Sequence, residues 1–193
     1  MPVIVMRESW MRCLVQSTTL LPEIAYRRSS GNWHSLLICL DHKISILKTP
    51  VELSLFIGVI QVNIEIDGFE FNARFEEDKS PHSCEAFRQS MPFNSHVVHV
   101  RWSGEGMWIP LGDKDYDVGP EDATAYPAPG QILLYPKGVS ETEILIAYGS
   151  VQFASKAGVL AGNHFATITS DLDKLREIGV STMWEGKKTI VFR

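Results

Sequence analysis

Cysteine is scarce in this chain of 193 residues, and long apolar runs are missing. The three cysteines, Cys13, Cys39 and Cys84, are odd in number and show no Cys-x-x-Cys spacing, so neither a disulfide framework nor a zinc site is indicated. We expect reduced thiols. The best apolar run, 53–60, is far shorter than the roughly 20 residues that a membrane span needs, and the N-terminus lacks the apolar stretch of a signal peptide. These absences predict a cytoplasmic protein.

An excess of positive charge is also missing. Lysine and arginine total 18 against 23 acidic residues, which gives a net charge of −5, and no basic cluster stands out. This balance argues against nucleic acid and membrane surfaces as partners, because both carry negative charge. Apolar residues make up 45% of the chain, as in an ordinary globular protein, and the length suits one domain with a real core.

The pattern of the chain changes near Gly58. Residues 1–57 contain plausible strands at 33–40 and 44–48 but no clear period and no helix caps, so we expect a variable, partly disordered extension. From residue 58 to residue 193, short strands and turn signals follow one another regularly. We therefore expect 58–193 to fold as a self-sufficient domain.

A β-hairpin is the sharpest local signal. Apolar residues alternate with polar ones over 62–66 and again over 69–75, and Asp67-Gly68 between them suits a two-residue hairpin turn. Further strands are predicted at 96–102, 131–135, 143–148, 163–169 and 187–192, with a turn at 103–106 and a polar loop at 112–130.

Two helices interrupt these strands. The first is predicted from Pro81, where a missing N–H costs nothing, with Ser80 as N-cap and Pro92 after its end. The second has Ser170 as N-cap and is expected to stop at Gly179. No strand–helix–strand alternation occurs, so the fold class is mostly β: an antiparallel barrel capped by two short helices.

Four segments, in their order along the chain, resemble the cyclophilins. Residues 80–87 resemble the "A-P-K-T-A-E-N-F" of the first cyclophilin helix, 160–165 the "L-D-G-K-H-V" of a late barrel strand, 171–178 the second helix and 186–190 the closing strand. The sequences of segments 99–105, 126–130 and 162–165 are similar to those of a bacterial family of cyclophilin-like proteins of unassigned function. The resemblance implies a cyclophilin-like barrel with a concave cleft.

The chain departs from the cyclophilins where they catalyse prolyl isomerisation. Their "F-H-R-V-I-P-x-F-M-x-Q-G-G" has no counterpart, because Val100 separates His99 from Arg101 and nothing like "F-M-x-Q-G-G" follows. A shift of one residue along a strand moves a side chain to the opposite face. His164 alone matches the position of a cyclophilin site residue by motif.

One candidate site lies where a strand is expected to end. His99, Arg101, Trp102, Glu105 and Trp108 combine two indoles, a cation, an imidazole and a carboxylate within ten residues. Such a mixture suits a ligand cleft, in which aromatic walls bury a small molecule and polar groups orient it. The alternative is structural: Trp102 belongs to the core, Arg101 lies over it, and Glu105 pairs at the surface.

A second candidate is His164, with Tyr148 as a possible neighbour. A histidine here could transfer a proton near neutral pH, or it could be a buried side chain satisfied by the backbone. No nucleophile lies at a recognisable spacing, so no catalytic triad is predicted. The acidic run 113–119 fails as a calcium loop because its Gly119 comes one residue late and position twelve is Thr124. We therefore expect no metal and no cofactor.

The functional prediction is a binding protein, or an enzyme of unassigned type, that holds a small molecule or peptide. A peptidyl-prolyl isomerase is the alternative, and the direction in which Arg101 points should separate the two. An assembly role without a ligand and a homo-oligomer also stay open. The cleft is expected to be lined by His99, Arg101, Trp102, Glu105, Tyr148 and His164.

Overall fold

The N-terminal part of the chain contains a small sheet of its own. The structure, a computed structural model, describes residues 10–12, 23–29, 32–40, 43–47 and 60–193, and it divides into two units, Met1–Val59 and Ile60–Arg193. The first unit holds four antiparallel strands in the order β1-β2-β3-β4. They are β1 (Trp10–Arg12), β2 (Glu23–Ser29), β3 (Asn32–Leu40) and β4 (Lys43–Leu47). The predicted Cys13 thiol lies outside the described residues.

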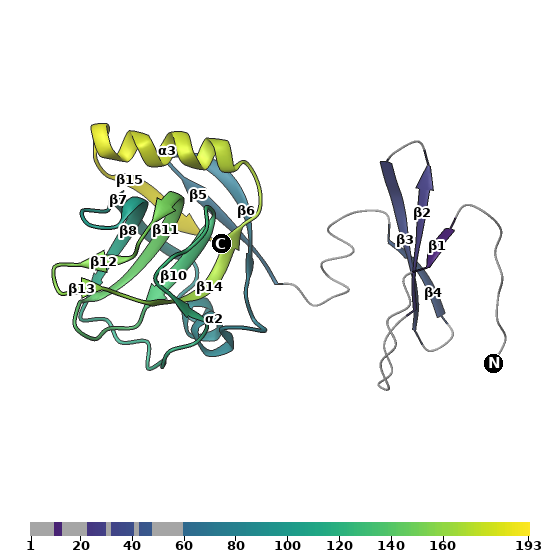
Figure 1. The fold of residues 1–193 in the computed structure, drawn as a ribbon, viewed down its shortest axis with the longest axis horizontal. Coiled ribbons are helices and arrows are strands. Elements are labelled where there is room, and N and C mark those ends of the chain that lie inside the picture. The colour runs from purple at the N-terminus through teal and green to yellow at the C-terminus, as the bar shows by residue number, and fades with distance from the viewer. Residues whose placement is uncertain (1–9, 13–22, 30–31, 41–42, 48–59) are drawn as a thin grey trace. The chain divides into compact units, whose positions relative to one another are not determined.

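The second unit is a closed antiparallel barrel (Figure 1). Its eight strands follow the order β10-β11-β8-β7-β15-β5-β6-β14, and a pairing between β10 and β14 closes the ring. The predicted fold class, a mostly β antiparallel barrel with two helices, is confirmed. The strands are β5 (Gln61–Ile66), β6 (Phe69–Phe75), β7 (Phe93–His99), β8 (Gly104–Gly112), β10 (Gln131–Tyr135), β11 (Thr142–Val151), β14 (Gly162–Ile168) and β15 (Lys188–Phe192).

Three short strands complete the second unit. Strand β9 (Ala123–Thr124) pairs with the start of β14, and β12 (Ala154–Ser155) forms a two-stranded hairpin with β13 (Gly158–Val159). The β12–β13 hairpin was not predicted. No helix in the described part of the chain is long and apolar enough to cross a bilayer.

The predicted β5–β6 hairpin is confirmed in its register and its turn. Ile66 pairs with Phe69, and Asp67 and Gly68 between them have φ values of 53° and 81°. Two consecutive residues with positive φ give the turn whose twist matches that of the flanking strands. Glycine meets this requirement without strain, and aspartate is among the side chains that tolerate it.

The two helices begin near their predicted positions but differ in detail. Helix α2 (Pro81–Arg88) follows Ser80, whose hydroxyl does not cap it. Glu121 accepts hydrogen bonds from the backbone N–H groups of His82 and Ser83 instead, at 3.0 and 2.8 Å. A carboxylate from a distant loop thus satisfies the free N–H groups of the helix.

Helix α3 (Leu172–Glu185) is longer than predicted, so the expected stop at Gly179 is wrong. Gly179 lies inside the helix, where a Cβ atom would be 2.2 Å from Cδ1 of the Tyr148 ring. The glycine allows α3 to approach β11 closely, and the helix ends at Gly186, whose φ is 95°. Gly179 is therefore needed for packing against Tyr148, although a glycine at this position is also typical of a helix end.

Strand β8 was missed because its beginning looks like a turn. Gly104 has a φ of 87°, and a Cβ atom there would be 2.6 Å from the carbonyl oxygen of Ser150 on β11. The glycine permits this close approach between two strands. The strand predicted at 96–102 ends at His99, and Val97, fully buried, is the residue that points into the core.

Strand β11 separates two apolar cores. Ile144, Ile146 and Tyr148 belong to the main core, which the barrel strands share with α2 and α3. Leu145 and Ala147 point to the opposite face, because side chains alternate along a strand. There they form a second core, which consists of Val100, Leu133, Tyr135, Leu145, Ala147, Val151, Phe153 and Leu160, with Trp108 packed against it.

Candidate functional site

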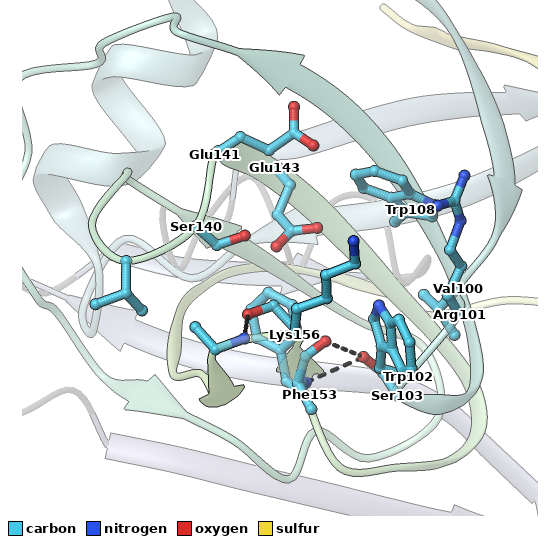
Figure 2. Close-up of a pocket in the computed structure, with 14 residues that line it drawn as sticks. Val100, Arg101, Trp102, Ser103, Trp108, Ser140, Glu141, Glu143, Phe153 and Lys156 are labelled. Atoms are coloured by element: carbon cyan, nitrogen blue, oxygen red, sulfur yellow. Dashed lines mark hydrogen bonds between the residues drawn. The ribbon is translucent and has the colours of Figure 1, made fainter.

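A pocket of about 360 Å³ opens beside the second core (Figure 2). Four parts of the chain line it: the bend 100–103 after β7, Trp108 on β8, residues 139–141 and Glu143 around the start of β11, and residues 153–157 around β12. These segments are distant in sequence, so the barrel and the β12–β13 hairpin together create the pocket.

Ser103 holds two of these segments in place. Its hydroxyl donates to the carbonyl oxygen of Ala154 and accepts from the N–H of Ala154, both at 3.1 Å. The carbonyl oxygen of Ser103 accepts a further bond from the N–H of Gln152 at 3.1 Å. Ser103 is itself buried, and these bonds hold β12 against the bend after β7.

Aromatic side chains form much of the pocket wall. Phe153 is buried and meets the Tyr135 ring edge to face, with ring centroids 6.0 Å apart. Trp108 packs against the second core, whereas Trp102 is 57% exposed. An apolar wall that continues from the core out to an exposed indole suits a flat organic ligand.

Glu143 is the unusual polar group of this pocket. It is 7% exposed, and in residues 60–193 its carboxyl group makes no hydrogen bond or ion pair. Burial raises the pKa of Glu143 to about 7, and the nearby negative charge of Glu141 adds to the effect. The carboxyl group can therefore give or take a proton near neutral pH, or pair with a cation.

Other residues of the pocket lining also carry polar groups. The indole N–H of Trp108 is buried and has no acceptor in the part of the chain that the structure describes. Arg101 and Lys156, both exposed, bring positive charge to the pocket, and Figure 2 shows the Lys156 side chain extending into it. The pocket thus combines an aromatic wall, one buried acid and two cations.

Two of the six predicted site residues, Arg101 and Trp102, line this pocket. Trp102 is not a core residue, so the structural alternative considered for it is wrong. Arg101 does lie on the face that holds the apolar wall, although a displaced position was expected for it. The strand ends before Arg101, so strand alternation does not determine its direction.

His99, Glu105 and Tyr148 lie apart from the pocket lining. His99 Nε2 is 2.8 Å from the Tyr148 hydroxyl, and its Nδ1 is 2.7 Å from the carbonyl oxygen of Val100. Since a carbonyl can only accept, Nδ1 carries the proton and Nε2 accepts from the tyrosine. Both ring nitrogens are occupied, and the buried Tyr148 belongs to the main core.

Glu105 connects the barrel to α3. Its carboxylate accepts from Arg176 of that helix at 2.6 Å and from the backbone N–H of Ser150 at 2.8 Å. These bonds hold the pKa of Glu105 below its usual value. The surface pairing that the sequence offered as the alternative for Glu105 is what the structure shows.

His164 is held in a separate polar network. It is 4% exposed, its Nε2 lies 2.9 Å from the Thr167 hydroxyl, and that hydroxyl donates to Glu76 at 2.5 Å. Burial lowers the pKa of His164, which favours the neutral ring. The pocket lining does not include His164, so the expected shared pocket of Trp102 and His164 is not found there.

A family model described as "Protein of unknown function (DUF3830)" matches residues 62–193. The chain belongs to this family. The matched range contains every residue of the pocket lining and all eight strands of the barrel except the first residue of β5. No curated protein matches the chain.

Solved structures similar to this DUF3830 member include McbB, described as a complex with tryptophan, at 20% identity and a TM-score of 0.51. The match covers 69% of this chain and 44% of McbB, so the chain spans less than half of McbB. The likeness shows a shared fold.

Two further structures are more distant. The hypothetical protein AF2241 from Archaeoglobus fulgidus has 12% identity and a TM-score of 0.44, over 70% of this chain and 94% of that one. A cyclophilin-type peptidyl-prolyl cis-trans isomerase of Cryptosporidium parvum has 10% identity and a TM-score of 0.41, over 63% and 84%.

Sequence reasoning missed Glu143, Phe153 and Lys156 as pocket residues of this DUF3830 member. A signal for Glu143 was present, because it immediately precedes the apolar run 144–148 and lies within a strand that is buried on both faces. A charged residue in such a strand is uncommon and often functional. Phe153 and Lys156 carried no comparable signal, since the hairpin that positions them was not predicted.

Proposed function

We propose that the chain binds a small organic molecule in the pocket beside the second core. The supporting observation is Glu143, a buried carboxyl group with no partner in residues 60–193, next to open space. Burial of an unpaired carboxylate is costly, and proteins keep such groups chiefly where a ligand or a reaction uses them. A volume of about 360 Å³ falls at the small end of ligand sites, which favours a small molecule over a peptide.

The pocket residues make different contacts with the ligand. Trp102, Trp108 and Phe153 offer flat apolar surface, and Glu143 orients the ligand through its carboxyl group. A pKa of about 7 also suits Glu143 to proton transfer, so the proposal includes an enzyme of unassigned type as well as a binding protein. McbB, with the same fold and a structure in complex with tryptophan, is a precedent for a small organic ligand.

Thermal shift with a library of small organic fragments tests this proposal. Fragments that bind the native state raise the melting temperature. We expect Trp102→Ala to abolish these shifts while the protein stays folded. Trp184→Ala is the matched control, because Trp184 lies on α3 and is 79% exposed outside the pocket. Equal shifts in both variants would contradict the proposed site.

A peptidyl-prolyl isomerase is the second candidate, and the position of Arg101 favours it. The guanidinium and the apolar wall share one pocket, as an isomerase requires. Glu143 speaks against it, because a proline ring offers no hydrogen-bond donor to a buried carboxyl group. We expect a short Ala-Pro peptide to isomerise at the uncatalysed rate, over tens of seconds. A thousandfold faster rate, lost in Arg101→Ala, would establish the isomerase.

The proposal extends to location and partners. The cysteine content supports a cytoplasmic protein, and Cys84 is a free, buried thiol. The net charge of −5 supports a small-molecule partner over nucleic acid or a membrane surface.

A further inference from the structure

We infer that the ligand of this pocket is a small aromatic zwitterion, an α-amino acid or a close analogue with a primary ammonium group and a carboxylate. The inference rests on the proposed function, because it names the ligand class of the same pocket. Three features carry it: the unpaired Glu143, the two cations Arg101 and Lys156, and the aromatic wall.

When Glu143 is ionised, a ligand group of opposite charge compensates its buried charge best. A neutral donor would leave the charge of an ionised carboxylate uncompensated, whereas an ammonium group supplies both charge and hydrogen bonds. The charged groups that face this site are Glu141 from the same strand, Lys156 from the β12–β13 hairpin and Arg101 from the bend after β7. Glu141 adds negative charge, so this side of the pocket favours a cation.

Arg101 and Lys156 supply the complementary charge for a carboxylate. Neither side chain pairs with an acid of this chain within residues 60–193, although both line the pocket. A ligand carboxylate would accept charge-assisted hydrogen bonds from either cation.

The rest of the ligand must match the wall and the volume. Trp102, Trp108 and Phe153 surround a space of about 360 Å³, which suits one aromatic ring with a short polar chain. Contact between rings adds to the free energy of burial, and an ammonium group beside an indole gains a cation–π attraction.

Three probes that differ by one charged group test the inference by calorimetry on the full chain. They are L-phenylalanine, phenethylamine, which lacks the carboxylate, and 3-phenylpropionate, which lacks the ammonium group. We expect L-phenylalanine to bind about tenfold more tightly, or better, than either analogue, because each analogue leaves one charged partner unpaired. The affinity of L-phenylalanine should fall below pH 7, where protonation of Glu143 competes with the ammonium group.

Variants assign each contact. Glu143→Gln should weaken the binding of L-phenylalanine by about tenfold or more and remove the preference over 3-phenylpropionate, whereas the control Glu70→Gln, at an exposed residue outside the pocket lining, should leave that preference in place. Arg101→Gln or Lys156→Gln should remove the preference over phenethylamine.

The outcomes separate this inference from the proposed function. Equal binding of L-phenylalanine and 3-phenylpropionate would overturn the role of the ammonium group, and the pocket would stand as a site for aromatic acids. If none of the three binds while other fragments show shifts that depend on Trp102, the ligand class is wrong and the site is right. If no compound binds, both proposals fail.

Discussion

The two faces of strands β8, β10 and β11 carry similar apolar residues. One face is enclosed in the main core, whereas the other borders an open pocket. On one face Ile109, Ile132 and Ile146 are fully buried in the main core, which includes side chains of both helices. On the other face Leu133 and Leu145 are equally buried, yet the second core is small and continues into an open pocket. The main core joins the barrel to both helices, whereas the second core borders the pocket that we propose as a binding site.

The difference appears most clearly along β11. Ile144 and Glu143 are neighbours, but the strand turns their side chains to opposite faces. Ile144 meets other apolar groups, and Glu143 meets the pocket. A buried acid without a partner lowers stability. The stability of the fold therefore does not explain a glutamate at position 143.

The largest expected effect comes from the main core. Phe87 of α2 lies between Phe165, Phe192 and Phe93, with ring centroids 4.9, 5.0 and 5.3 Å away. Phe87→Ala should lower the free energy of unfolding by about 3–5 kcal/mol, because it removes apolar contacts and leaves a cavity. Urea denaturation measures this loss. A loss below about 1 kcal/mol would mean that the barrel does not depend on this cluster.

Glu143→Gln should raise the free energy of unfolding, whereas most mutations of buried residues lower it. The folded protein holds the carboxyl proton with a pKa of about 7, whereas the ordinary value is 4.5. The folded state therefore binds the proton more tightly than the unfolded chain, and its stability falls as the pH rises from about 4.5 to about 7. Above pH 7 the variant should be more stable than the wild type by about 2 kcal/mol, a figure reduced from the full shift because water enters the open pocket.

The measurement is urea denaturation at pH 5 and pH 8 for both proteins. The stability advantage of Glu143→Gln should be small at pH 5 and close to its full size at pH 8. Glu70→Gln serves as the control, because Glu70 is exposed and lies outside the pocket lining. An advantage that does not change with pH would mean that the wild-type carboxyl group is not destabilised by ionisation.

Trp102→Ala should have a much smaller effect on stability. The side chain is more than half exposed, so its removal should change the free energy of unfolding by no more than about 0.5 kcal/mol. Thermal denaturation without ligand checks this. A loss of several kcal/mol would place Trp102 in the core after all and would leave the pocket without its outer wall.

Deletion of residues 1–56 should have the smallest effect on the stability of the barrel. Every strand of the barrel lies at or after Gln61, and β1 to β4 pair with one another. We expect residues 57–193 to stay soluble and to melt cooperatively, as followed by circular dichroism. An insoluble or molten product would mean that the N-terminal segment completes the domain.

Sequence patterns predicted the barrel because its strands keep simple local signals. The Asp67-Gly68 turn and the strands at 131–135, 143–148 and 163–169 agree with the structure to within a few residues. Two glycines misled the prediction, Gly104 as a turn and Gly179 as a helix end. Both are required by close packing across the fold, Gly104 against the Ser150 backbone and Gly179 against the Tyr148 ring, which no local pattern reveals.

The lining of the pocket was predicted in part. Arg101, Trp102 and Trp108 were chosen for their chemistry, and all three line the pocket. His164 and Tyr148 were chosen by resemblance and proximity, and the structure places their polar atoms in hydrogen bonds elsewhere. The decisive residue, Glu143, depends on pairings between β8, β10 and β11 that bury both faces of one strand. The sequence alone does not specify those pairings.

The pKa of Glu143, followed by NMR on protein with isotope-labelled glutamate side chains, tests the central claim most directly. The claim is that one face of β11 presents a buried, unpaired acid to a ligand pocket. It predicts a titration midpoint near 7, which falls when L-phenylalanine occupies the pocket, because an ammonium group stabilises the carboxylate. A midpoint near 4.5 in the free protein would show that Glu143 is solvated or already paired, and would contradict the account.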